Sequence, residues 1–215
     1  MRHFCTLLLA ATAAACFAAS APAAVVLSLD TEFSGASEPE GTSPWLTATI
    51  ENAGTDMVTI TMSAANLVGT EFVSQWLFNL DPSKSISSID YVSGQAAVNG
   101  ATFSVDAYKA DGDGYYDLQF DFGLADNSDR LTAGETSVYK ITGAGIDENS
   151  FSFFDSGGSK GDFQSAAHVQ SIQEDQSGWI GAGGDGVIPE PGSLLVWSLL
   201  ALSVGIFTVR RGRRS

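Results

Sequence analysis

An acidic loop in the middle of the chain carries the residue types that bind hard metal ions. Asp111, Asp113 and Asp117 lie close together in sequence and alternate with glycine and tyrosine. Calcium takes about six to eight oxygen ligands, and short aspartate-rich loops supply several of them from one segment. The main-chain carbonyl of Tyr115 and the carboxylate of Asp121 could complete such a shell. The same pattern is typical of a hairpin turn with solvated acids, so a calcium site and a simple turn remain as alternatives.

Aromatic residues and a histidine are the other candidates for ligand contact. Trp45 follows a proline and Trp179 follows a glycine near the end of the body, so both are expected to be exposed enough to stack on sugar rings. Trp76 shares one strand face with other apolar residues and is expected in the core. His168 lies on a predicted strand, where a hydrogen-bonded structural role is expected and a general base is the alternative. No catalytic residue is assigned.

The elements expected to position these residues are short β-strands. Apolar and polar residues alternate over 56–63, 102–106 and 116–122, which is the period of a half-buried strand. Further strands are predicted over 46–52, 135–142, 150–154 and 166–172. We therefore predict one all-β domain over residues 25–176, a single antiparallel β-sandwich of jelly-roll-like type.

The charge of the chain limits its partners. Of the 215 residues, 10 are Lys or Arg and 25 are Asp or Glu, which gives a formal net charge of −15. Binding of nucleic acid needs a basic surface, and an anionic membrane surface repels an acidic body. Cations, neutral ligands and polysaccharide stay compatible with this charge. The sequence also contains no phosphate-binding, dinucleotide-binding or hydrolase motif of known spacing.

The first 24 residues predict a secretory signal peptide. A basic start is followed by an apolar run, and small residues then converge on an Ala-Pro-Ala cleavage pattern, with cleavage after Ala23 or Ala24. Both cysteines, Cys5 and Cys16, lie in this segment. The exported chain is therefore expected to contain no disulfide and no thiolate metal site.

The last residues predict a second targeting segment. A Gly-rich tether is expected over 177–187, followed by a segment, 188–215, with three parts. These parts are the motif Pro189, Glu190 and Pro191, a transmembrane helix over 193–209, and a basic tail over 210–215. The cluster of arginines that follows the apolar stretch indicates that this end stays in the cytoplasm.

This three-part tail resembles the PEP-CTERM sorting signal of Gram-negative bacteria. The resemblance implies recognition by an exosortase, an integral membrane peptidase or transpeptidase, with Pro189, Glu190 and Pro191 as the recognition element. It also implies a membrane-anchored precursor, later delivered to the cell surface or released, in bacteria that form biofilm on secreted polysaccharide. The stretches 109–122, 134–136 and 166–172 resemble extracellular domains that carry the same tail, and no activity comes with that resemblance.

These observations together predict a non-enzymatic protein of the cell surface or extracellular matrix that associates with polysaccharide. One alternative is a calcium-assisted carbohydrate-binding module, and another is a secreted hydrolase. Converging carboxylates in a deep cleft would favour the hydrolase, whereas a shallow groove lined by Trp45 or Trp179 would favour sugar binding. A featureless sandwich would favour the structural role.

Overall fold

The structure, a computed structural model, describes residues 24–125, 127–173 and 175–183. The described residues form twelve strands and two short 3-10 helices, and every strand pair is antiparallel, which confirms the predicted all-β class. The strands are β1 (Ala24–Leu29), β2 (Thr31–Glu32), β3 (Leu46–Gly54), β4 (Met57–Ser63), β5 (Phe72–Phe78), β6 (Ser88–Gly94), β7 (Ala101–Ala110), β8 (Asp113–Asp121), β9 (Leu131–Thr132), β10 (Thr136–Thr142), β11 (Phe163–Ile172) and β12 (Gln176–Gly183). The 3-10 helices are η1 (Asn127–Asp129) and η2 (Glu148–Phe151).

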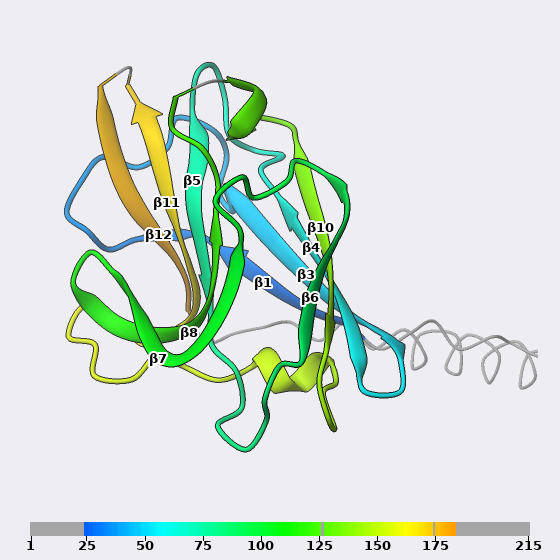
Figure 1. Cartoon of the computed structure of the whole chain (residues 1–215). Helices are drawn as coiled ribbons and strands as arrows, with labels where there is room; N and C mark the ends of the chain where they lie inside the picture. Colours follow the sequence, from blue (N-terminus) through cyan, green and yellow to red (C-terminus); the bar gives the residue numbers. More distant parts are fainter. Residues whose placement is uncertain (1–23, 126, 174, 184–215) are drawn as a thin grey trace, which may run out of the picture. The chain divides into compact units, whose positions relative to one another are not determined.

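Two antiparallel sheets pack against each other in a sandwich-like arrangement (Figure 1). The first has five strands in the order β1-β3-β4-β10-β6. The second has the order β2-β12-β11-β5-β8-β7, with β9 beside β5. The chain passes repeatedly from one sheet to the other, so neighbouring strands are often distant in sequence.

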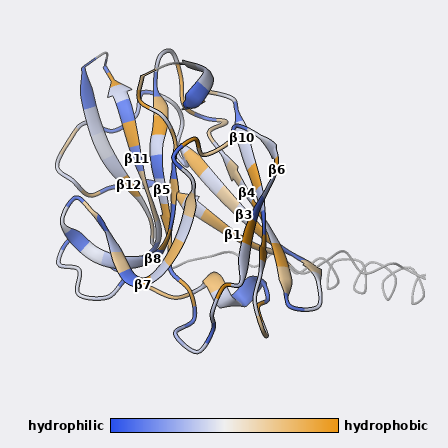
Figure 2. Ribbon diagram, in the orientation of Figure 1, coloured by the Kyte–Doolittle hydropathy of each residue, from blue (hydrophilic) through white to orange (hydrophobic). Residues whose placement is uncertain are grey.

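The five-stranded sheet follows the alternation expected from its sequence. On β4, Val58, Ile60 and Met62 are fully buried, and the residues between them are partly exposed. The register places Ile60 opposite Ile50 on β3, so apolar side chains from neighbouring strands share one face. Apolar positions recur in this way along the strands of both sheets (Figure 2).

Aromatic side chains connect the two sheets through the core. The rings of Phe78 on β5 and Phe120 on β8 meet edge to face, with centroids 5.8 Å apart. Phe120 in turn lies 4.8 Å from the ring of Tyr139, which belongs to β10 of the other sheet. Trp76 is fully buried, as predicted, and its indole N–H donates to Ser165 Oγ at 2.9 Å. Such a core leaves little room for a ligand between the sheets.

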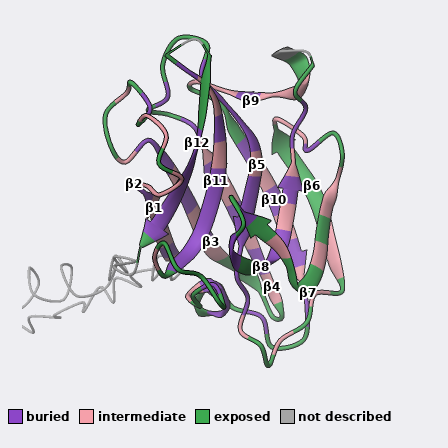
Figure 3. Cartoon of the chain, turned by 90° about the vertical axis from the view of Figure 1, so that its left-hand side faces the viewer, coloured by how far each residue is buried: buried purple, intermediate pink, exposed green. Residues whose placement is uncertain are grey.

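The seven-stranded sheet buries its second face as well. A separate apolar cluster lies on that face, because Leu77 points away from the side shared by Trp76 and Phe78. Figure 3 shows β5 and β11 almost continuously buried, whereas β6 and β7 are mostly exposed. The members of this second cluster are Leu77, Ala110, Tyr116, Phe163, Ala166 and Trp179, with Phe33 and Tyr108 packed against them.

The predicted Gly-rich tether is wrong for residues 177–183, because they form β12 between β11 and β2. The glycines here serve close packing rather than flexibility. A Cβ at Gly181 would lie 2.3 Å from the ring of Phe163, and one at Gly178 would lie 3.3 Å from the Cβ of Ala36. Glycine therefore lets neighbouring side chains lie against the strand backbone.

The predicted strand over 150–154 is also wrong, because η2 occupies the start of this range. Asp147 caps the helix: its side chain accepts from the main-chain N–H of Ser150 at 3.0 Å, and the Ser150 hydroxyl accepts from the N–H of Asp147. A reciprocal cap of this kind stabilises a helical turn. Apolar alternation alone did not reveal this cap.

Several predictions fall outside the described residues. These are the signal peptide up to residue 23, residues 184–187 of the tether, and the whole sorting segment with its transmembrane helix. Within 24–125, 127–173 and 175–183, no helix has the length and apolar character needed to cross a membrane.

The packing of β12 gives a test of its place in the sheet. Replacing Gly181 with Ala should lower the free energy of unfolding by about 1–3 kcal/mol, because the added methyl group would collide with the Phe163 ring. Gly183→Ala is the matched control, since no atom lies within 4 Å of its added Cβ. Urea unfolding of both variants measures the difference. Equal stability of the two would contradict the packing described for β12.

Candidate functional site

The acidic loop is a tight hairpin turn between β7 and β8. Ala110 pairs with Asp113, and the two residues between them, Asp111 and Gly112, have φ values of 50° and 71°. Two successive positive φ values are the geometry of the two-residue turn that Asp-Gly favours. The turn alternative from the sequence therefore describes the local backbone.

The structure does not bring Asp111, Asp113 and Asp117 together as calcium ligands, so that predicted metal site is wrong as a set. Asp111 is exposed and forms an ion pair with Lys160. Asp113 is buried and accepts hydrogen bonds from the main-chain N–H groups of Ser159 and Lys160. Among the residues that the structure describes, no group of three or more His, Cys, Asp or Glu side chains is placed to hold a metal ion.

Asp117 has a structural role that explains its burial. Its two carboxylate oxygens accept from the main-chain N–H of Leu80 at 2.9 Å and of Asp106 at 2.8 Å. Asp106 has a φ of 49° and lies where the β7–β8 pairing is interrupted between Phe103 and Tyr108. Asp117 therefore holds an irregular part of β7 against the end of β5.

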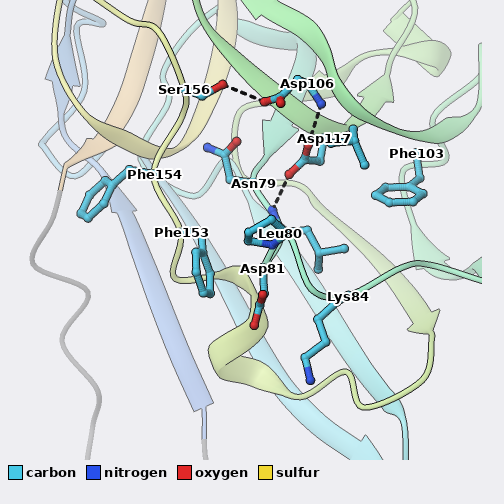
Figure 4. A pocket seen from close by; sticks show the side chains of 12 residues that line it. Asn79, Leu80, Asp81, Lys84, Phe103, Asp106, Asp117, Phe153, Phe154 and Ser156 are labelled. Carbon is cyan, nitrogen blue, oxygen red and sulfur yellow. Dashed lines mark hydrogen bonds between the residues drawn. The ribbon is translucent and has the colours of Figure 1, made fainter.

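A groove lies next to these hydrogen bonds, and we call it the aromatic groove (Figure 4). Asp106 extends the connection by accepting from the Ser156 hydroxyl at 2.7 Å, so strand β7 is also tied to the segment between η2 and β11. The volume of the groove is about 210 Å³, below the ~300–1,000 Å³ of typical enclosed ligand pockets. Its lining residues are Asn79, Leu80, Asp81, Pro82, Lys84, Phe103, Val105, Asp106, Asp117, Phe153, Phe154 and Ser156.

The exposed aromatic rings are the unusual feature of this groove. Phe153 is 39 % exposed and Phe154 is 46 % exposed, although most large apolar side chains that the structure describes are buried. Both come from the segment after η2, and Phe103 reaches the groove from β7 (Figure 4). Neighbouring exposed apolar side chains with polar groups at their edge mark binding sites.

Charged residues line the same groove. Asp81 accepts from the Ser83 main-chain N–H at 2.8 Å, and hydrogen bonds from Ser83 hold the pKa of Asp81 below its usual range. The Asp81 carboxylate is therefore ionised at neutral pH. Lys84 supplies a positive charge to the same groove. The groove thus combines flat apolar faces with hydrogen-bond donors and acceptors.

The two tryptophans predicted as ligand platforms are buried, so that prediction is wrong. Trp45 is 4 % exposed, and its indole N–H donates to the carbonyl of Gly41 at 3.0 Å. Trp179 is 8 % exposed and stacks on His168 with ring centroids 4.7 Å apart and planes 4° apart. The proline before Trp45 and the glycine before Trp179 suggested exposed loops. Trp179 instead lies in the apolar cluster on the second buried face of the seven-stranded sheet.

His168 lies on β11 as a hydrogen-bonded strand histidine. Its Nδ1 is 3.3 Å from Ser74 Oγ and 3.2 Å from Gln170 Nε2. Burial lowers the pKa of His168, so the ring is neutral at pH 7. Ser74 is 3 % exposed, and its hydroxyl also lies 3.3 Å from the main-chain carbonyl of His168. These contacts tie the hydroxyl to the sheet and leave it little access to a substrate.

Sequence reasoning missed the exposed phenylalanines of the groove, although Asp117, another lining residue, was a candidate metal ligand. Phe153 and Phe154 were assigned to a strand, because serine and phenylalanine alternate just before them. The adjacency of the two phenylalanines was a sign against this strand. Neighbouring strand residues point to opposite faces, so burying both rings would need cover on both faces of the strand. Pro189, Glu190 and Pro191 of the predicted sorting motif lie outside the described residues.

The hydrogen bonds of Asp117 generate a stability prediction. Asp117→Asn removes one acceptor oxygen and should cost about 1.5–3 kcal/mol in the free energy of unfolding, because a buried main-chain N–H would face an amide N–H. Asp111→Asn removes a carboxylate from a partly exposed ion pair and should cost less than about 1 kcal/mol. Denaturant unfolding compares the two. A negligible effect at Asp117 would refute its bridging role.

Comparison of the chain with models of protein families, with curated proteins and with solved structures gave no match.

Proposed function

We propose that this protein is exported, has no enzymatic activity, and binds extracellular polysaccharide through the aromatic groove. The observation that carries the proposal is the pair of exposed rings, Phe153 and Phe154, beside ionised and polar groups. A sugar ring offers an apolar face of C–H groups and a rim of hydroxyls. The groove offers matching chemistry, with aromatic faces for the first and Asp81, Asp106 and Lys84 for the second.

The size and charge of the site support a binding role. A hollow of about 210 Å³ fits one side of a chain ligand rather than enclosing a whole substrate. The net charge of −15 favours neutral glycans over polyanions such as nucleic acid. The repeated passage of the chain between two antiparallel sheets supports the finer assignment as a jelly-roll-like sandwich.

We also propose that the two ends of the chain direct its export and its processing. Residues 1–24 would direct export, and the PEP-CTERM-like segment 188–215 would hold a precursor in the inner membrane by its helix over 193–209. An exosortase would then process the chain at Pro189, Glu190 and Pro191. The support is the order of motif, apolar stretch and arginines in the sequence. The product would lie at the cell surface or in the matrix of a biofilm.

The groove is tested by removing its rings. The double variant Phe153→Ala and Phe154→Ala should bind polysaccharide at least about tenfold more weakly, equivalent to about 1.4 kcal/mol. Leu124→Ala is the matched control, because Leu124 is an apolar side chain that is 60 % exposed outside the groove. Affinity electrophoresis through gels that contain polysaccharides of neutral and acidic composition measures retention. Equal retention of both variants would place any binding elsewhere on the protein.

The sorting motif is tested separately. In a host that contains an exosortase, Glu190→Ala should accumulate as full-length precursor in the inner-membrane fraction, because the recognition carboxylate is lost. Asp185→Ala removes a carboxylate upstream of the motif and should mature normally. Immunoblots of cell fractions report the outcome. Normal maturation of the Glu190 variant argues against the motif as a processing signal.

A further inference from the structure

Four buried side-chain oxygen atoms have no hydrogen-bond partner among the described residues, and two of them belong to neighbouring side chains. These two are Oδ2 of Asp155 and the hydroxyl of Tyr116. Asp155 is 8 % exposed and Tyr116 is fully buried. A buried polar atom without a partner costs about 1–3 kcal/mol, and an uncompensated charge costs more. Native proteins avoid such costs unless a ligand, an ion or water supplies the contact.

The unpartnered carboxylate oxygen points to a place where other oxygens converge. A Cβ placed on Gly158 would lie 2.6 Å from Asp155 Oδ2, 3.1 Å from the carbonyl oxygen of Gly161 and 3.2 Å from Asp113 Oδ2. On its other side, the Asp155 carboxylate lies so close to Gly114 that a Cβ there would be only 1.9 Å away. Glycine at both positions thus lets this carboxylate lie against the main chain.

Carboxylates lie close to one another around this place. Burial raises the pKa of Asp155, and the nearby carboxylates of Asp113 and Asp162 raise it further, whereas hydrogen bonds from the main-chain N–H groups of Phe163 and of Asp155 itself lower it. Burial and the carboxylates of Asp155 and Asp113 also raise the pKa of Tyr116. The ammonium group of Lys160 forms its ion pair with Asp111 at the surface.

We propose that Asp113, Asp155 and the main-chain carbonyl of Gly161 bind a calcium ion between the β7–β8 hairpin and the segment that leads into β11. Carboxylate and carbonyl oxygens are the ligands that calcium prefers, whereas zinc and copper favour nitrogen and sulfur. Two carboxylates neutralise the ion, the Tyr116 hydroxyl lies beside them, and water completes a shell of six to eight oxygens. The proposal does not depend on polysaccharide binding.

The site differs from the acidic loop that the sequence suggested. It keeps Asp113, leaves out Asp111 and Asp117, and takes its second carboxylate from Asp155, which follows η2. The segment after Asp155 is already joined to β8, because the N–H of Tyr115 donates to the Ser156 carbonyl at 2.9 Å. A bound ion would fix this segment more firmly and with it the neighbouring wall of the aromatic groove.

Calcium binding is tested on the purified full-length chain by calorimetric titration and thermal unfolding. With a dissociation constant of about 1 mM, typical of extracellular sites, about 10 mM calcium should raise the Tm by roughly 3–6 °C. Magnesium at equal ionic strength should produce little of this rise, because it demands shorter distances and a strict octahedron. Titration should show one calcium ion per chain.

Two variants remove the site in different ways. Asp155→Asn should lose the calcium-dependent rise in Tm while its Tm without calcium stays equal to or above that of the wild type, because a buried uncompensated charge is removed and the acceptor for Phe163 N–H is kept. Gly158→Ala places a methyl group among the three oxygens and should also lose the calcium response. Asp111→Asn is the control and should respond as the wild type does.

Three results would overturn the proposal. The first is a wild-type chain that calcium does not stabilise more than magnesium, as expected if a buried water joins Asp155 and Tyr116. The second is a full calcium response in both Asp155→Asn and Gly158→Ala. The third is a loss of the calcium response in Asp111→Asn alone, which would indicate that calcium binds at the hairpin turn. Failure of polysaccharide binding in the same preparations would bear only on the groove.

Discussion

The burial of both faces of the seven-stranded sheet is the constraint on which the other features depend. Its inner face packs on the five-stranded sheet, and its outer face carries the cluster around Leu77, Phe163 and Trp179. An apolar outer face must be covered by something other than a third sheet. The curled β7–β8 hairpin, through Tyr108 and Tyr116, and Phe33 contribute to that cover. The β7–β8 hairpin also contributes residues to both candidate sites: Phe103, Asp106 and Asp117 to the aromatic groove, and Asp113 to the Asp113–Asp155 pair.

The acidic character of the chain is partly structural. Several buried carboxylates accept main-chain N–H groups: Asp117 from Leu80 and Asp106, and Glu71 from Glu40 and Val68. Charged acceptors make stronger hydrogen bonds than neutral ones, and they can fix loops that have no regular ladder. A count of acidic residues therefore overstates how many are available to bind cations or repel anions. Among the described residues, Oδ2 of Asp155 and Oε2 of Glu148 are the buried carboxylate oxygens without a hydrogen-bond partner.

The sequence was sufficient to predict the all-β class and most strands, because alternation such as that of Val58, Ile60 and Met62 reports one buried face directly. It was insufficient for β12 and for Trp179, because a period of two does not say whether the second face is covered as well. Gly178 and Gly181 were interpreted as flexible for the same reason. The pairing of Asp113 with Asp155 could not be predicted either, since it depends on how the chain returns from η2 to β11 rather than on any local spacing.

The end of β12 sets a limit on access to the chain's last segment. Gly183 is the final residue of that strand, and only residues 184–188 separate it from Pro189. A fully extended backbone from Gly183 to Pro189 spans at most about 22 Å. A membrane-embedded enzyme that cut the chain near Pro189 would therefore act no more than about 22 Å from Gly183, the last residue of β12. Under the proposed sorting, β12 would either tolerate this close approach or complete its pairing with β11 and β2 after the cut.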